Sequence, residues 1–150
     1  ADTLRGQTVT GTTLYTLSEK ASDAESEELA QRENRADAIS GVNLSGQSEE
    51  VAGILIDLAQ RDSRNKASLF SRQALAQLKT VTKMTGKPLR SAGFTVLKPQ
   101  EIPSLLIELG FRSNPKDEER LRAAAGRKTM AKALASAIDT HFAPAVAQNP

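Results

Sequence analysis

Cysteine is absent from this 150-residue chain, and aromatic residues make up only 3% of it. Disulfides and thiolate metal sites are therefore excluded. The compartment stays open, because a cysteine-free chain suits the cytosol and the periplasm alike. The 20 basic residues are interspersed with 18 acidic ones. A nucleic-acid interface usually needs a clustered basic face with stacking aromatics, so we expect no nucleic-acid partner.

Long apolar runs are missing as well. Each run is shorter than ten residues, which is too short for a membrane span. The first residues, Ala1-Asp2-Thr3, show neither a start methionine nor the basic and then apolar layout of a secretion signal. We therefore expect no membrane span, and we interpret the chain as a processed or excised segment.

The composition, with 39% hydrophobic and 25% charged residues, is typical of one globular domain. Residues 9–17 predict a strand, in which Gly11 indicates a bulge or a close backbone approach. Ser22 and Glu25 resemble a capping box that opens a helix to about Ile39. Charged residues outnumber apolar ones in this helix, so we expect it to be weakly anchored.

A second helical pattern follows a linker at residues 41–48 and ends before residues 86–88 (GKP). Its first apolar stripe consists of Val51, Ile54, Leu55 and Leu58. The polar residues 60–68 leave two interpretations, one long helix or two helices that break near Asp62, and we favour one helix with a kink. Residues 93–98 predict a short strand.

The most apolar short run, residues 103–111, contains a single carboxylate, Glu108. If the run is a strand, Glu108 lies at its carboxyl end, just before Gly110. Ligands and catalytic groups collect at that edge of open α/β sheets. The alternative is a buried or rim carboxylate paired with an arginine such as Arg112. Both interpretations stay open on this motif alone.

The C-terminal region predicts helices. Residues 113–115 (SNP) and the acidic residues after them are typical of a capped helix start. We expect a pause near Gly126 and a final helix that ends around Phe142, followed by a flexible tail at residues 143–150. The apolar stripe of the final helix is Met130, Leu134 and Ile138. The order of elements predicts an α/β fold, a mixed sheet flanked by helices.

Motifs for other chemistry are lacking. His141, the only histidine, lies near the end of the last predicted helix, where we interpret it as structural or solvated. The glycines are scattered and form no phosphate-binding loop, and no nucleophile elbow is present. Glu108 therefore remains the single suggestive catalytic residue.

Four stretches carry a resemblance to a known family: residues 9–18 (VTGTTLYTLS), 33–37 (EN followed by AD), 92–97 (AGFTVL) and above all 102–114 (IPSLLIELGFRSN). Over about residues 1–142 the chain resembles the C-terminal half of the zinc-dependent N-acetylmuramoyl-L-alanine amidases of cell division. The resemblance implies a periplasmic peptidoglycan hydrolase that cleaves the amide between N-acetylmuramic acid and the L-alanine of the stem peptide. It also implies a helical autoinhibitory or regulatory insert at residues 22–85 of the catalytic domain.

In this family two histidines and a glutamate hold the zinc ion, and the chain supplies none of the three in the matching places. Its start, Ala1-Asp2, resembles the pair that directly follows the second histidine, which implies that the chain alone is an incomplete zinc enzyme. The aspartate of that pair can approach the metal in autoinhibited members. Asp2 is therefore a candidate zinc ligand, with an exposed terminal residue as the alternative.

Glu108 matches the family's catalytic glutamate. The resemblance implies that its carboxylate accepts a proton from zinc-bound water and returns it to the leaving amine.

The helix that begins near Ser22 matches the element with which such amidases plug their own zinc cleft, until an activator protein with a degenerate peptidase-like domain withdraws it. Glu33 is the first candidate for the plugging carboxylate and Glu28 the second, and a solvated charged helix is the alternative. The activator would bind the stripe Val51, Ile54, Leu55 and Leu58, unless that stripe faces the core.

A different class of function is also consistent with the sequence. The chain would then be a non-catalytic regulatory or interaction module that binds a division activator through residues 48–82.

Overall fold

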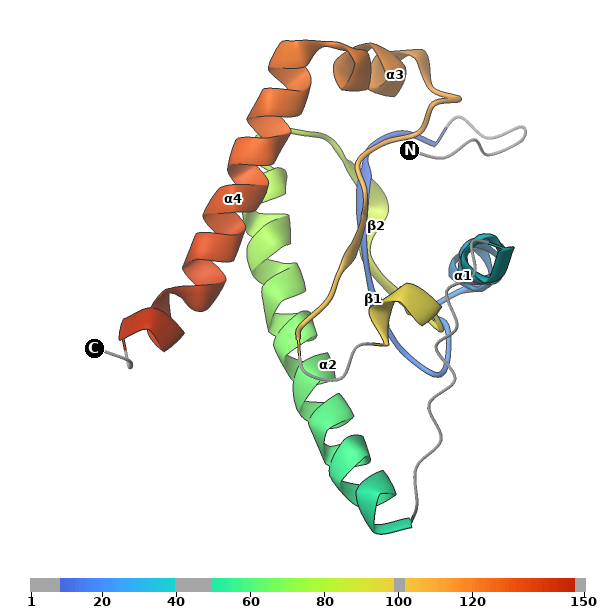
Figure 1. Cartoon of the computed structure of the whole chain (residues 1–150). Helices are drawn as coiled ribbons and strands as arrows, with labels where there is room; N and C mark the ends of the chain where they lie inside the picture. The colour runs from blue at the N-terminus through green and yellow to red at the C-terminus, as the bar shows by residue number, and fades with distance from the viewer. Residues whose placement is uncertain (1–8, 40–49, 99–101, 148–150) are drawn as a thin grey trace. The chain divides into compact units, whose positions relative to one another are not determined.

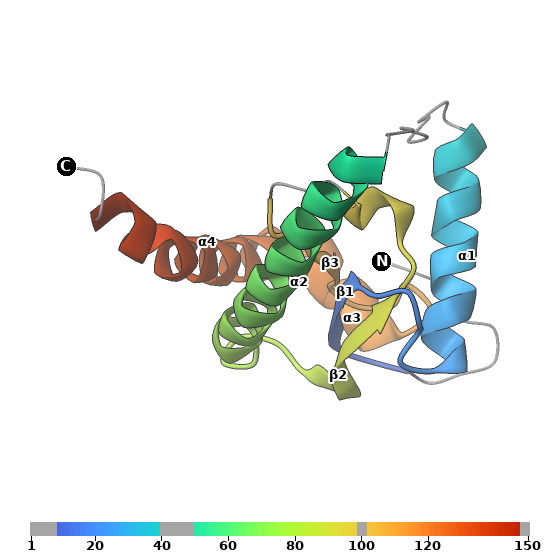
Figure 2. The same ribbon diagram turned by 90° about the horizontal axis from the view of Figure 1, so that it is seen from below.

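The computed structural model describes residues 9–39, 50–98 and 102–147, and the side chains of residues 9–36, 60–98 and 102–144. It has the predicted α/β architecture (Figures 1 and 2). The strands are β1 (Thr12–Leu17), β2 (Met84–Ala92) and β3 (Leu106–Glu108). The helices are α1 (Ala24–Ile39), α2 (Glu50–Leu78), the 3₁₀ helix η1 (Thr95–Leu97), α3 (Pro115–Arg122) and α4 (Ala124–Ala147). None of the described helices is long and apolar enough to cross a bilayer.

The sheet has three strands in the order β2-β1-β3, so β1 is central. The Thr12 N–H donates to the Lys83 carbonyl at 2.8 Å. Six residues further along β1, the Ser18 N–H donates to the Ala92 carbonyl at 3.1 Å, so β1 and β2 run parallel. β3 runs the other way, because the Thr12 hydroxyl donates to the carbonyl of Leu109, just past the end of β3, at 3.2 Å. The sheet is therefore mixed.

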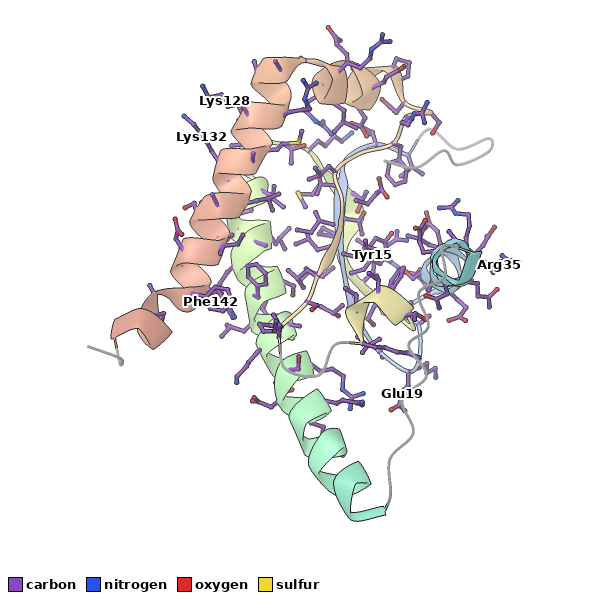
Figure 3. The ribbon with its side chains drawn as sticks, viewed as in Figure 1. Tyr15, Glu19, Arg35, Lys128, Lys132 and Phe142 are labelled. Atoms are coloured by element: carbon purple, nitrogen blue, oxygen red, sulfur yellow. The ribbon has the colours of Figure 1, made fainter. Side chains whose placement is uncertain are left out.

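Two compact units make up the chain, and each has buried apolar residues of its own. Unit 1 consists of Ala1–Leu14, Phe70–Leu89 and Ile107–Pro150, and unit 2 of Tyr15–Leu69 and Arg90–Leu106. The buried apolar side chains of unit 1 are Leu14, Ala74, Leu78, Phe111, Met130, Ala133 and Ala137. The core cluster of unit 2 consists of Tyr15, Ala30, Ala92, Phe94 and Leu97. In it the rings of Tyr15, labelled in Figure 3, and Phe94 meet edge to face, with centroids 5.3 Å apart.

The strand predicted near the N-terminus is confirmed as β1, and the prediction for Gly11 holds too. Gly11 has a φ of +108°, a left-handed conformation that L side chains rarely adopt. A Cβ atom on this residue would lie 2.7 Å from the backbone carbonyl carbon of Met84. The glycine therefore permits the close approach of the chain before β1 to the start of β2.

The strand predicted at residues 93–98 is wrong. The observed strand, β2, comes earlier and contains residues 86–88, which we had interpreted as the end of the helical region. Among the described strands β2 lies at the edge of the sheet, a position where proline is tolerated because its missing N–H removes no interior ladder bond. After β2 the chain turns through η1, and this turn buries Phe94 and Leu97.

The start of α1 corrects the predicted capping box. Asp23, rather than Ser22, caps the helix, since its carboxylate accepts hydrogen bonds from the Ser26 N–H at 2.9 Å and the Ser26 hydroxyl at 2.7 Å. The Ser22 hydroxyl instead accepts from the Ser91 N–H at 3.1 Å. Asp23 thus caps the helix, and Ser22 connects the segment before it to β2.

The helix α2 is continuous over 29 residues, which agrees with our choice of one long helix over two. It begins at Glu50, and the linker predicted at residues 41–48 lies outside the described residues. Within unit 1, the end of α2 contacts α4: the His141 Nδ1 atom and the Gln73 side-chain oxygen are 2.8 Å apart. The Phe70 and His141 ring centroids are 4.8 Å apart, so of the two roles we expected for His141, structural or solvated, these contacts favour the structural one.

The helix start after residues 113–115 is confirmed, but the pause and the end of the last helix differ from the prediction. The break falls at Ala123, while Gly126 lies inside α4, where a Cβ atom would collide with the Arg120 carbonyl. The buried stripe of α4 is Met130, Ala133 and Ala137, since Ile138 is exposed. Lys128 and Lys132 project from α4 (Figure 3), and α4 continues to Ala147, into the segment expected as a tail.

Candidate active site

Glu108 is the last residue of β3, as predicted, and it is partly buried in unit 1. We expected this place because ligands collect at the carboxyl edge of open α/β sheets, but the direction of β3 does not fit that reason. Ligands collect at the carboxyl edge of parallel strands, whereas β3 is antiparallel to β1, so its carboxyl end lies at the amino end of β1. The pairing of Glu108 with Arg112, which is exposed, stays a prediction.

Asp117 lies nine residues after Glu108 and is completely buried. It was not among the site residues predicted from the sequence. It is the third residue of α3, whose cap Asn114 accepts hydrogen bonds from the Lys116 and Asp117 N–H groups. An acidic residue in the first turn of a helix usually faces solvent and stabilises the helix dipole. Asp117 instead has 0% of its surface exposed. Local sequence carries no signal that separates these two situations.

The carboxylate of Asp117 accepts three hydrogen bonds. Its Oδ2 atom accepts from the Gly11 N–H at 2.8 Å and the Phe111 N–H at 3.1 Å. Its Oδ1 atom accepts from the Thr10 hydroxyl at 3.0 Å, and Arg120 Nη2 lies 3.1 Å from the same oxygen. Burial by itself would raise the pKa of Asp117, but these hydrogen bonds and the Arg120 charge together hold its pKa below the usual value. Asp117 is therefore ionised at neutral pH.

In unit 2, α1 makes polar contacts with the segment from Arg90 to Thr95, while its Ala30 lies in the core cluster. The Asn34 side chain donates to the Gly93 carbonyl at 2.8 Å and accepts from the Thr95 N–H at 2.7 Å. Arg90 Nη1 lies 2.6 Å from a Glu25 oxygen and 3.5 Å from an Asp23 oxygen. Burial alone would lower the pKa of Arg90, but these carboxylates raise it above its usual value.

The two carboxylates predicted to plug the site, Glu33 and Glu28, lie on the surface of α1. Glu28 is exposed, and 46% of the Glu33 side chain is exposed, with an oxygen 3.7 Å from Arg32 Nη2. They are five residues apart, which is about 140° around a helix, so they project in different directions. Both belong to unit 2, whereas Glu108 belongs to unit 1.

A hollow in unit 2 combines two cations with small polar and apolar groups. Its lining consists of Leu17, Gln60, Ser63, Arg64, Ala67, Leu97, Lys98 and Ser104. Arg64 Nη1 is 3.5 Å from an oxygen of Glu19, which is almost fully exposed and labelled in Figure 3. The Glu19 carboxylate therefore balances part of the positive charge of the hollow.

The remaining predicted site residues are outside the described part of the chain. Asp2 precedes the first described residue, and the side chains of Val51, Ile54, Leu55 and Leu58 are likewise not described. Among the described residues, no group of three His, Asp or Glu side chains is placed to hold a metal ion. The described residues thus do not fit a zinc site by themselves, since such a site needs three or four ligands.

Comparison with known proteins gives a consistent result. A family profile described as N-acetylmuramoyl-L-alanine amidase matches residues 1–140. The chain is 32% identical over 143 residues to "N-acetylmuramoyl-L-alanine amidase AmiA" of Escherichia coli strain K12, a match that covers 95% of the chain and 50% of that protein. It is similarly 32% identical to AmiA of Salmonella typhimurium, with the same coverage. Against AmiC of Escherichia coli O6:H1 it is 31% identical over 144 residues, 95% of the chain and 34% of AmiC. The chain therefore spans about half the length of these AmiA proteins.

Proposed function

Because this chain belongs to the N-acetylmuramoyl-L-alanine amidase family, we propose that its full-length protein hydrolyses peptidoglycan at the amide between N-acetylmuramic acid and the L-alanine of the stem peptide. The family match over residues 1–140 is the observation that carries this proposal, since it includes Glu108 and the turn that follows it.

The reaction adds water across the amide. The water oxygen bonds to the lactyl carbonyl carbon, the carbon–nitrogen bond breaks, and the alanine nitrogen leaves with an added proton. Glu108 would accept a proton from the attacking water and deliver one to the leaving nitrogen. Its partly buried place at the end of β3 supports this role, because a rigid strand end holds a general base in a constant position.

The nature of the products tests the proposed activity. We expect the full-length protein to release stem peptides with a free N-terminal L-alanine from purified sacculi, and to leave glycan strands with unsubstituted lactyl groups. Mass spectrometry of the soluble and insoluble fractions measures both products. Cleaved glycosidic bonds, or cleaved cross-links with the stem still attached to the sugar, would contradict the assignment.

We propose zinc as the metal of the full-length enzyme, and periplasmic cell division as its setting. Since the described residues do not form a zinc site, the ligands would have to include residues outside the described ranges, of which Asp2 is one candidate.

Autoinhibition by α1 is the second part of the proposal. An element with few buried apolar contacts opens at low cost, and among the described side chains of α1 Ala30 is the one buried apolar residue. Asn34 and Arg90 add polar contacts between α1 and the rest of unit 2. An activator protein that binds only the displaced form would shift the equilibrium towards activity. The stripe from Val51 to Leu58 would bind this activator, which we propose has a degenerate peptidase-like domain.

Replacement of Glu33 by alanine is expected to raise the basal rate of the full-length protein about tenfold, the effect of losing roughly 1.4 kcal/mol of plug binding. The rate of stem-peptide release without an activator measures this effect. Glu27→Ala is the matched control, because Glu27 is exposed on the same helix and undergoes the same chemical change. An increase with Glu28→Ala instead would move the role to Glu28. Unchanged rates in both variants would remove Glu33 and Glu28 from the role of plugging carboxylate.

A further inference from the structure

The turn that follows Glu108 is held by an ion pair in unit 1 between Asp117, which is buried, and Arg120, which is partly buried. Asp117 accepts from the Phe111 N–H, three residues after Glu108, at 3.1 Å. Its partner Arg120 donates through Nη2 to the carbonyl of Leu109, the residue directly after Glu108, at 2.9 Å. The chain thus leaves β3 with its next carbonyl and a nearby N–H both held by the pair Asp117 and Arg120.

The same pair connects this turn to the central strand. The Asp117 carboxylate also accepts from the Gly11 N–H at 2.8 Å and the Thr10 hydroxyl at 3.0 Å, just before β1. In addition, the Thr12 hydroxyl donates to the Leu109 carbonyl at 3.2 Å. The end of β3 is therefore held to the start of β1 beyond the point where the sheet ladder stops.

Gly110 shows how closely the backbone lies against the pair. A Cβ atom on Gly110 would be 2.9 Å from Arg120 Nη2 and 3.1 Å from Asp117 Cβ. A side chain at this position would therefore collide with the pair, so the backbone of the turn lies directly against Asp117 and Arg120.

The geometry of the ion pair does not maximise the stability of the fold. Arg120 Nε is buried and has no hydrogen-bond partner among the residues that the structure describes. A buried donor without a partner is unfavourable, and a buried ion pair is in general weak evidence for stability. What the pair does achieve is to fix two backbone groups next to Glu108 in one geometry.

We propose that Asp117 is a positioning residue of the amidase: together with Arg120 it fixes the backbone after Glu108 and thereby the place of the Glu108 carboxylate relative to the attacking water. This inference rests on the proposed role of Glu108 as the general base. It adds a residue that touches neither substrate nor metal and that acts through the turn at residues 109–111.

Asp117→Asn in the full-length protein tests the proposal. The substituted amide keeps the size of the side chain but removes the charge and directs an NH₂ group at groups that are themselves donors. Because displacement of a catalytic group by about 1 Å can cost on the order of 100-fold, we expect kcat on a soluble N-acetylmuramoyl peptide to fall about 10- to 100-fold. KM should change less than about twofold, since substrate contacts are untouched.

A control for stability separates positioning from folding. Met130→Ala removes a buried side chain of α4 in the same unit and is expected to destabilise the protein, while it leaves the hydrogen bonds of Asp117 and Arg120 in place. At a temperature where thermal unfolding shows both variants to be folded, Met130→Ala should keep the wild-type kcat. If Asp117→Asn then has the same kcat as Met130→Ala, the proposal is wrong.

Thr10→Val covers the case in which Asp117→Asn does not fold. It removes the single hydrogen bond from the Thr10 hydroxyl to Asp117 Oδ1, the oxygen that also pairs with Arg120, and we expect a fall in kcat of about two- to fivefold at unchanged KM. A wild-type kcat in a folded Thr10→Val protein would overturn the proposal. The role of Glu108 is checked separately, because a wild-type rate in Glu108→Gln would refute the base itself, whatever the result at Asp117.

Discussion

Replacement of Glu108 by glutamine in the full-length protein is expected to lower the rate of stem-peptide release by about 10²- to 10⁴-fold, the usual contribution of general acid–base catalysis. Glutamine has nearly the shape of glutamate but can neither accept the proton of the attacking water nor return it to the leaving nitrogen. The loss should appear in kcat rather than in KM. Dye-labelled sacculi, or a soluble muramyl peptide, provide the rate measurement.

Glu119→Gln is a matched control for this variant. Glu119 lies in the same unit, is exposed in α3, and undergoes the same loss of charge. We expect its rate to equal that of the wild type. The thermal unfolding temperature of Glu108→Gln should also stay close to the wild-type value, because the residue is only partly buried. A Glu108→Gln protein that is folded and fully active would exclude Glu108 as the base.

Among the substitutions considered, Gly11→Ala is expected to lower the free energy of unfolding most, by about 3 kcal/mol or more. The loss would come from backbone strain together with overpacking. The φ of +108° is unfavourable for alanine. The new methyl group would meet three backbone atoms of β2 and the residue before it, at 2.7 to 2.9 Å, and these cannot rotate away as a side chain could. The Gly11 N–H that donates to Asp117 would be displaced at the same time. Urea unfolding followed by circular dichroism measures the loss.

Gly86→Ala provides the comparison for Gly11→Ala. Gly86 lies in the edge strand β2, and no atom outside its immediate neighbours lies within 4 Å of the position that its Cβ would take. We expect its unfolding free energy to stay within about 0.5 kcal/mol of the wild type, as for most surface substitutions. Equal stabilities of the two alanine variants would show that the close approach at Gly11 is not a constraint on the fold.

Elements with strong local signals were predicted well from sequence. The strand β1, the single long helix α2 and the start of α3 at Pro115 agree with the structure. Each depends on neighbours along the chain: Thr and Val favour a strand, a helical stripe repeats every three or four residues, and Asn114 caps the helix that Pro115 begins. The predicted end of β3 at Glu108 is of the same kind, since Gly110 follows it.

Elements that depend on their place in the sheet were predicted poorly. Residues 86–88 have the composition of a break, and only the position of β2 at the sheet edge allows Pro88 within a strand. Gly126 is a residue type that often ends a helix, yet it lies inside α4. A glycine is needed there because the Arg120 carbonyl leaves no room for a side chain. The order of the strands explains Pro88, and the approach of the Arg120 carbonyl explains Gly126. A local sequence pattern contains neither.

The candidate site divides in the same way. The sequence was enough to select Glu108 as a candidate, through the residues around it. It was also enough to indicate the family and to select the candidate carboxylates of α1. The strand direction of β3, the burial of Asp117 and its link from Gly11 to Phe111 could come only from the folded chain. Asp117 and Glu118 are adjacent acidic residues in the first turn of one helix, but Asp117 is buried and Glu118 is not. The physical reason is that a hydrogen bond between residues 106 positions apart exists only after the sheet has brought them together.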